Sequence, residues 1–261
     1  MAIPKVIHYC WFGRNPKPKL AEKCINSWKK KCPDYQIIEW NEDNFDFSQN
    51  LYCKQAYENK MWAFVTDYAR LWILYNYGGI YFDTDVEMIK NIDKFLDDKC
   101  FMCVEKSIYC NKVNTGVGLG AEPQNSVIKA LMKSYDNIPF IVNGEFDKTT
   151  CTVRNTEILK TFGFVEEDKT QVFDDFTVYS SDYFSPIEME NGFEKRTKNT
   201  HTIHHYSLSW TPKENQIARK KSLRKLRRKD ILYNIKVFPN TVLLKIFGEK
   251  NYKKIKDKFS K

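Results

Sequence analysis

Two aspartates spaced two residues apart, Asp83 and Asp85, are the side chains in this sequence best suited to do chemistry. They follow Gly78-Gly79, a pair that can adopt the positive φ that ends a helix and turns the chain. Between the glycines and the aspartates, Ile80–Phe82 is β-branched and aromatic, which predicts a short buried strand. Because residues i and i+2 of a strand point to the same side, we expect the two carboxylates to project together from the strand's end.

Two carboxylates this close repel each other unless a cation lies between them. Hard divalent ions such as Mg²⁺ and Mn²⁺ take oxygen ligands and commonly bridge protein carboxylates to the phosphates of a substrate. The pattern therefore predicts a metal–diphosphate site, and the alternative is a surface turn with two solvated aspartates. The position directly after a buried strand, where open α/β sheets place their ligands, favours the site.

The segment before the glycines predicts a buried helix over residues 62–77. Its side chains are apolar almost all the way round, which is typical of a helix inside the protein. The exceptions are Asp67 and Arg70, which lie three residues apart on one face. Either the two pair with each other, a costly way to build a core, or both face a polar pocket. The sequence leaves both interpretations open.

The opening of the chain predicts a β-α-β unit and hence the start of a parallel sheet. Lys5–Trp11 and Tyr35–Trp40 are the two expected strands, and Pro16–Lys31 between them is the expected helix. Further elements are expected later in the chain: a strand at Cys100–Glu105, a helix from Pro123 to about Tyr135, a helix near Arg154–Thr161, and short strands at 171–173 and 176–179. The sequence therefore predicts an α/β fold.

Charge is distributed unevenly along the 261 residues. Residues 213–261 hold 17 Lys/Arg and 4 Asp/Glu, a net charge of +13; since the whole chain carries +9, residues 1–212 carry −4. We expect a body at 1–212 and a basic amphipathic helical tail at 213–261. Such a tail indicates an anionic partner, either a membrane surface or a nucleic acid.

The remaining composition favours a cytoplasmic protein. An apolar content of 42% can supply a core, and no apolar run is long enough to span a membrane. The first dozen residues lack the features of a signal peptide. The eight cysteines are scattered, and Cys100-Phe-Met-Cys103 has no second such pair to complete a zinc site, so we expect reduced thiols, mostly in the core.

Three of the four histidines fall in His201–Trp210, which reads as a strand. Clustered imidazoles, hydroxyls and an indole can offer a metal ligand, phosphate donors and a lid residue together. The alternative is a strand whose histidines have ordinary hydrogen-bond partners. Strand alternation allows only one of His204 and His205 to face inward.

These motifs, in their order along the chain, resemble the Asp-x-Asp sugar transferases of glycosyltransferase family 32. They are Ile3–Trp11, Asp67-x-x-Arg70, Tyr77–Asp85, His204-His205 and Ser209-Trp210. The resemblance covers about residues 1–210 and extends more distantly to the glucosyltransferase domain of large clostridial toxins. It implies a GT-A fold, with a Rossmann-like, mostly parallel central sheet flanked by helices, and Mn²⁺ or Mg²⁺ as cofactor.

The resemblance also implies roles for individual residues. Asp67, Arg70, Asp83 and Asp85 would be the catalytic set. The donor would contact Trp11, stacked on the base, together with Asp67, Arg70, Asp83, Asn114, Ser209 and Trp210. Asp85 would bind the metal directly, Asp83 would reach it through water, and His205 would be a metal ligand or phosphate contact. Segment 137–200 and the tail match no motif of the family.

The implied function is retaining transfer of a sugar from a nucleotide sugar, most simply a UDP-sugar, to a glycan or lipid-linked oligosaccharide. For the bacterial members of the family this serves capsule or lipopolysaccharide synthesis. With the basic tail, it suggests a cytoplasmic enzyme held peripherally on the inner face of an anionic membrane, with no nucleic-acid partner.

Two other classes of protein share part of this pattern. Haloacid dehalogenase-type phosphatases also carry Asp-x-Asp after an apolar strand, but they require Thr or Val where this chain has Glu87. A nucleic-acid-binding protein acting through its basic tail is the second alternative, although no nucleic-acid module accompanies the tail.

Overall fold

The computed structural model describes residues 2–208, 211, 214–219 and 221–226. The chain divides into two units, Met1–Trp210 and Thr211–Lys261, and each is described by itself. In the second unit the described residues 214–219 and 221–226 are helical, as expected for the start of the tail. The expectation for the rest of the tail lies outside the described residues, and the roles predicted for the two parts stay predictions.

The described part of the first unit is built on one central sheet. Its strands, in spatial order, are β10 (Gln171–Val172), β11 (Thr177–Tyr179), β5 (Cys100–Lys106), β7 (Leu119–Ala121), β3 (Gly79–Tyr81), β1 (Val6–Cys10) and β2 (Gln36–Trp40), with β6 (Asn111–Asn114) paired to β5 as well. Two small ribbons pair β12 (Thr202–His204) with β4 (Val86–Met88) and β8 (Ile141–Val142) with β9 (Glu145–Phe146).

Strand direction in the central sheet agrees with the expected fold. β2, β1 and β3 are parallel neighbours, and β5 and β11 are parallel to each other. β7 runs antiparallel to both β3 and β5, so β3 and β5 share one direction across it. The sheet is therefore mostly parallel, as predicted, and the carboxyl ends of β1, β3 and β5 meet at one edge.

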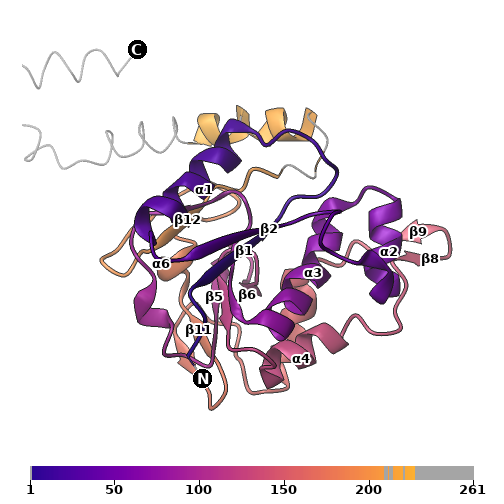
Figure 1. Cartoon of the computed structure of the whole chain (residues 1–261). Helices are drawn as coiled ribbons and strands as arrows, with labels where there is room; N and C mark the ends of the chain where they lie inside the picture. The colour runs from indigo at the N-terminus through magenta and orange to yellow at the C-terminus, as the bar shows by residue number, and fades with distance from the viewer. Residues whose placement is uncertain (1, 209–210, 212–213, 220, 227–261) are drawn as a thin grey trace, which may run out of the picture. The chain divides into compact units, whose positions relative to one another are not determined.

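Helices cover both faces of the sheet. The described α-helices of the first unit are α1 (Lys19–Lys31), α2 (Leu51–Glu58), α3 (Trp62–Tyr77), α4 (Ser126–Lys133), α5 (Cys151–Lys160) and α6 (Ser181–Phe184). α2, α3 and α4 gather on one side, and α1 and α6 lie on the other (Figure 1). The core follows the same division, with Leu71 and Leu74 of α3 in one buried cluster and Trp28 and Phe82 in the second.

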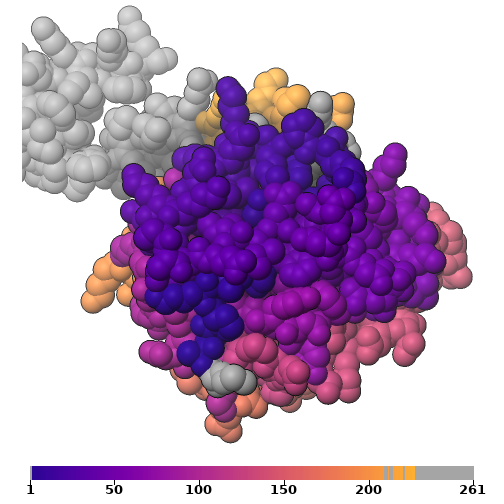
Figure 2. Space-filling view, in the orientation of Figure 1, coloured from indigo at the N-terminus to yellow at the C-terminus, as the bar shows by residue number. Residues whose placement is uncertain are grey.

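The face seen in Figure 2 is formed mostly by the N-terminal part of the chain, coloured indigo to purple. None of the helices formed by the described residues has the length and apolar character needed to cross a bilayer. All eight cysteines are free thiols, and all but Cys110 are buried, which confirms the expectation of reduced core cysteines.

Candidate active site

The Asp-x-Asp motif lies at the edge where the parallel strands end, but in a turn and not on the strand itself. β3 stops at Tyr81 and β4 begins at Val86, so Asp83 and Asp85 belong to the connection between them. The prediction that strand alternation aligns the two carboxylates is therefore wrong, because neither aspartate lies in a strand. The turn is closed by a hydrogen bond from the Val86 amide to the Asp83 carbonyl (3.0 Å), and it directs the two side chains to different partners.

Arg70 joins the first aspartate to the buried helix α3. Its Nη2 lies 3.0 Å from Asp67 Oδ1 and 3.3 Å from Asp83 Oδ1. Nε donates to the Thr66 carbonyl (2.9 Å), and Tyr81 donates its hydroxyl to Asp83 (3.0 Å). Asp67 and Arg70 thus pair with each other, as the first interpretation expects, and Arg70 also contacts Asp83; that the pair faces a polar pocket stays a prediction. Burial raises the pKa of Asp67, which marks it as a carboxylate that depends on Arg70 for its charge.

Gly116 leaves the space in which Asp83 and Arg70 contact each other. A Cβ on residue 116 would lie 2.0 Å from Asp83 Oδ2 and 2.8 Å from Arg70 Nη1. The Asp83 amide donates to the Gly116 carbonyl (2.8 Å), so the loop after β6 and the turn after β3 are tied together. The side chain of Asn114 accepts a hydrogen bond from the Gly116 amide (2.7 Å). The predicted residue Asn114 is therefore linked to Asp83 through Gly116.

Asp85 engages the strand β12. Its Oδ1 lies 3.3 Å from Nε2 of His204, and its Oδ2 accepts from the Ser207 amide (2.7 Å). Burial alone would raise the pKa of Asp85, but His204 and the Ser207 amide stabilise its charged form and hold its pKa well below the usual range. Burial likewise opposes protonation of His204, yet the Asp85 charge raises its pKa.

The structure decides between the two histidines. His204 faces Asp85, whereas Nε2 of His205 lies 2.8 Å from Glu87. The metal role predicted for His205 stays a prediction, but in this arrangement the imidazole beside the Asp-x-Asp motif belongs to His204. Ser209 and Trp210 lie outside the described residues.

Glu105 is a site residue that the sequence reasoning missed. It lies at the end of β5, where it accepts from Asn114 Nδ2 (2.8 Å) and approaches Nδ1 of His204 at 3.9 Å. Burial raises the pKa of its carboxyl group. Its place at the end of an expected strand, at the same edge as Asp83, was the available signal.

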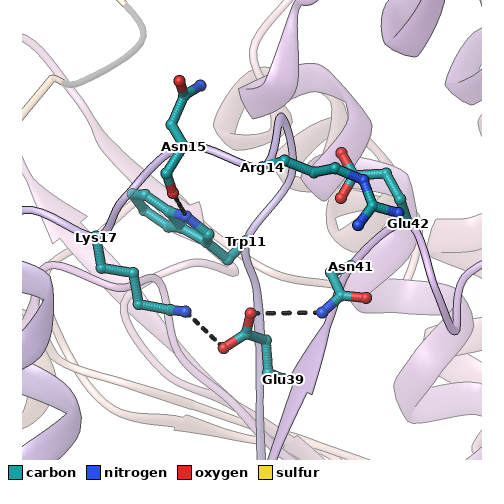
Figure 3. A pocket seen from close by; sticks show the side chains of 7 residues that line it. All are labelled: Trp11, Arg14, Asn15, Lys17, Glu39, Asn41 and Glu42. Carbon is teal, nitrogen blue, oxygen red and sulfur yellow. Dashed lines mark hydrogen bonds and ion pairs between the residues drawn. The ribbon is translucent and has the colours of Figure 1, made fainter.

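Trp11 lies beside a hollow at the end of β1 (Figure 3). Its indole N–H donates to the Asn15 carbonyl (2.6 Å), and the Lys17 amine lies 5.8 Å from the ring centroid. Lys17 also pairs with Glu39 (2.7 Å) across the hollow, whose volume is about 260 Å³. The hollow is lined by Trp11, Arg14, Asn15, Lys17, Glu39, Asn41 and Glu42. The base-stacking role of Trp11 stays a prediction.

The donor atoms suit a hard divalent cation that keeps part of its shell for substrate or water. Among the described residues no three His, Cys, Asp or Glu side chains come together as a complete metal cage. The Asp85–His204 pair offers one carboxylate and one imidazole, and Asp83 lies two residues away on the same turn. Because Mg²⁺ and Mn²⁺ are commonly held by one or two carboxylates plus substrate phosphates, this set fits them.

Comparison with known proteins agrees with this geometry. Residues 18–102 match the family described as "Glycosyltransferase sugar-binding region containing DXD motif". The match confirms the resemblance to Asp-x-Asp sugar transferases drawn from the motifs. The matched stretch contains Asp67, Arg70, Asp83 and Asp85; the sugar-binding roles predicted for them stay predictions.

Individual relatives are also similar. The chain is 32% identical to inositol phosphoceramide mannosyltransferase 1 of Schizosaccharomyces pombe over 38% of this chain and 33% of that protein. It thus spans about a third of the length of that curated relative. It is 26% identical to the uncharacterized glycosyltransferase L373 of Acanthamoeba polyphaga mimivirus over 80% of this chain and 84% of that one. A solved glycosyltransferase involved in glycosylation of the major capsid of PBCV-1 is 13% identical with a TM-score of 0.48, over 84% of this chain and 100% of that one.

Proposed function

We propose that this protein is a metal-dependent, retaining glycosyltransferase that moves a sugar from a nucleotide sugar, first of all a UDP-sugar, to a glycan or lipid-linked acceptor. The observation that carries the proposal is the meeting of Arg70, Asp67 and Asp83 beside the Asp85–His204 pair at one sheet edge. Carboxylates and a guanidinium can hold sugar hydroxyls in directed hydrogen bonds.

The chain's own residues would divide the work along this edge. Asp67 and Arg70 hold hydroxyls of the donor sugar, and Trp11 offers a flat face to the base. Asp85 and His204 would hold Mn²⁺ or Mg²⁺, with Asp83 near by; when bound, the cation would stabilise the negative charge that develops on the departing diphosphate. The bond between the sugar's anomeric carbon and the diphosphate oxygen breaks, the acceptor hydroxyl attacks the same carbon from the face that the diphosphate vacates, and the departing phosphate takes the hydroxyl's proton, which retains the anomeric configuration.

The acceptor is proposed to be borne on a lipid. Support comes from the yeast relative, whose name specifies inositol phosphoceramide, and from the net charge of +13 at residues 213–261. We further propose that these residues form a separate part that docks the enzyme on the inner face of an anionic membrane. A role in capsule or lipopolysaccharide synthesis would follow if the source is bacterial.

The test is a screen of UDP- and GDP-sugars, mannose donors included, for hydrolysis in the presence of Mn²⁺. We expect one donor to be hydrolysed and the rate to fall to background in excess chelator. Phosphatase activity on simple phosphate esters without turnover of any nucleotide sugar would favour the phosphatase alternative. Anomer analysis of the transferred sugar by NMR would decide between retention and inversion.

A further inference from the structure

Three side chains with unpartnered polar atoms, Tyr52, Tyr135 and Arg154, are neighbours, and a fourth, Asn155, follows Arg154 in the helix α5. Of the described residues' buried side-chain nitrogens and oxygens, five have no hydrogen-bond partner. One is Nδ1 of His204, and the other four are the hydroxyls of Tyr52 and Tyr135, Nε of Arg154 and Oδ1 of Asn155. Such atoms destabilise a fold, so a cluster of them points to a function that needs polar groups there.

The cluster borders Asp67. The guanidinium carbon of Arg154 lies 5.0 Å from the ring centroid of Tyr135 and 5.6 Å from that of Tyr52, and the two rings are 5.1 Å apart. Burial and then the charge of Asp67 raise the pKa of both tyrosines, which places the carboxylate within electrostatic reach of them.

Asn155, the residue after Arg154, is linked to Arg70 through a single hydroxyl. Its Nδ2 donates to Thr115 Oγ1 (3.0 Å), and Nη1 of Arg70 donates to the same oxygen (3.5 Å). Asn155 and Thr115 are both fully buried, so water does not compete for these bonds. The helix α5 that carries Asn155 is fastened separately, by a hydrogen bond from the Val113 amide to Thr156 Oγ1 (2.9 Å).

A leucine at position 155, which has the same number of side-chain heavy atoms, would avoid the unpartnered Oδ1, so stability alone does not account for the amide. We propose that Asn155 is a positioning residue: acting through Thr115, it holds the Arg70 guanidinium against Asp67 and Asp83, and α5 thereby helps to set how the donor's sugar is held. The inference deepens the proposed function and rests on it. It concerns a helix outside the matched residues 18–102.

The test uses matched variants of the full chain. Thr115→Val and Asn155→Leu remove the two polar groups and keep the number of side-chain heavy atoms, and Thr115→Ser keeps the hydroxyl. Thr156→Val serves as the control, because it removes one hydrogen bond of α5 that does not lead to Arg70. For each variant, calorimetry measures Kd for the nucleotide sugar selected by the screen and for the matching free nucleoside diphosphate.

We expect Thr115→Val and Asn155→Leu to weaken nucleotide-sugar binding about five- to tenfold and to leave the free diphosphate unchanged, a loss of about 1–1.4 kcal/mol. Thr115→Ser should restore most of the affinity. The double variant should lose no more than either single one, since both act through one chain of bonds. Equal effects on both ligands, or an equal effect of Thr156→Val, would overturn the inference.

A second measurement needs no donor. Asn155 does not touch Arg70 directly, so if it acts through Thr115 the Asn155→Leu variant should shift the ¹⁵N resonance of Arg70 Nε, assigned with Arg70→Lys. An unshifted resonance contradicts the positioning role. If no nucleotide sugar binds the unmodified protein, the proposed function fails, and the resonance still decides whether Asn155 positions Arg70.

Discussion

Arg70 collects groups from three separate segments of the chain. Thr66 and Asp67 belong to its own helix, Asp83 follows β3, and Thr115 follows β6. Removing one partner of a buried charged network leaves the others without compensation, which costs more than the loss of one exposed pair. Asp67 and Asp83 are therefore positioned by a cation of the protein itself.

At this scale the first prediction concerns Asp85. We expect Asp85→Asn to lower turnover at least a hundredfold and to weaken Mn²⁺ binding, because the variant loses the charged oxygen that faces His204. Electron paramagnetic resonance of Mn²⁺ with the free nucleotide measures binding independently of activity. Asp98→Asn is the control. Asp98 accepts a hydrogen bond from the Tyr179 hydroxyl (2.8 Å) and precedes β5, so it lies at the end of that strand opposite to the candidate site. Full activity of Asp85→Asn in excess chelator would refute the metal role.

Gly116 gives the second prediction. In Gly116→Ala the new methyl group must displace the Asp83 carboxylate from Arg70, since its Cβ would start 2.0 Å from Asp83 Oδ2. We expect turnover to fall at least tenfold while the melting temperature changes by only a few degrees, because the displaced atoms are side-chain ends and not backbone. Turnover equal to that of the unmodified protein would show that the Asp83–Arg70 contact is dispensable.

Most site residues could be identified from the sequence because each belongs to a short motif. Asp67 and Arg70 stand out as polar residues in an apolar helix, and Asp83 and Asp85 follow a glycine turn and strand. Glu105 could not be assigned in this way, since its role depends on the pairing of β5 with β6 and on β12 approaching from 100 residues further along.

At the scale of the elements, β1, which lies between β3 and β2 in the sheet, carries the buried histidine His8. The Trp40 indole donates to His8 Nδ1 (3.0 Å), so Nε2 carries the hydrogen and donates to the Gly78 carbonyl (3.0 Å). Burial lowers the pKa of His8 to about 4. The neutral imidazole thus fixes the end of α3 relative to β1, close to the glycines that lead into the site.

The stability of the fold should therefore depend on pH through His8. His8 binds a proton near pH 6.5 in the unfolded chain but only near pH 4 in the folded one. The contribution of the neutral His8 to the free energy of unfolding is therefore fully present above pH 6.5 and is lost as the pH falls from 6.5 to 4. We expect a loss of about 3 kcal/mol from pH 7 to pH 4 that the His8→Gln variant does not show. Urea unfolding at both pH values measures the difference. Parallel losses in the two proteins would assign the effect to other groups.

Trp11, the residue predicted to stack on the nucleotide base, directly follows β1. We expect Trp11→Ala to weaken binding of the free nucleotide by about 1–3 kcal/mol, the value of a base stacked on an aromatic side chain. Trp11 is partly exposed and lies at a strand end, so the variant should still fold. Calorimetry with the free nucleotide decides, and unchanged affinity would remove Trp11 from the site.

Most elements with a clear pattern were predicted, including the short strands β10 and β11, whereas α2, β6 and β7 were not. α3 spans the same residues as the expected helix, and β1, α1 and β2 follow the expected β-α-β order. The helix α2 was missed: it has only eight residues, and its signal is the Asn50 side chain, which accepts from the Cys53 amide as a cap. Strands β6 and β7 are polar or glycine-containing, so only their pairing with β5 and β3 makes them strands.

At the scale of the whole molecule, charge separates the chain into an acidic body and a basic tail. Each basic residue near an anionic lipid surface contributes about 1 kcal/mol, so a few in contact would suffice for usable affinity. We expect the intact chain to sediment with anionic but not with neutral vesicles, and high salt to release it.

A chain ending near residue 213 is the matched control. It should remain in the supernatant and still hydrolyse the donor, because the described contacts of the candidate site lie within residues 2–208. An intact chain that ignores anionic vesicles at low salt would contradict membrane docking.

The position of β7 has a consequence for how the molecule is made. β3, which leads into the Asp-x-Asp turn, is flanked by β1 on one side and by β7 on the other. Both neighbours lie outside the matched residues 18–102, one before and one after. That stretch would leave its central strand with two bare edges if it were produced by itself, and such edges favour aggregation. During synthesis β3, which leads into the Asp-x-Asp turn, likewise cannot complete its pairing until residue 121 has left the ribosome, so a stall before that point leaves an incomplete sheet with exposed strand edges.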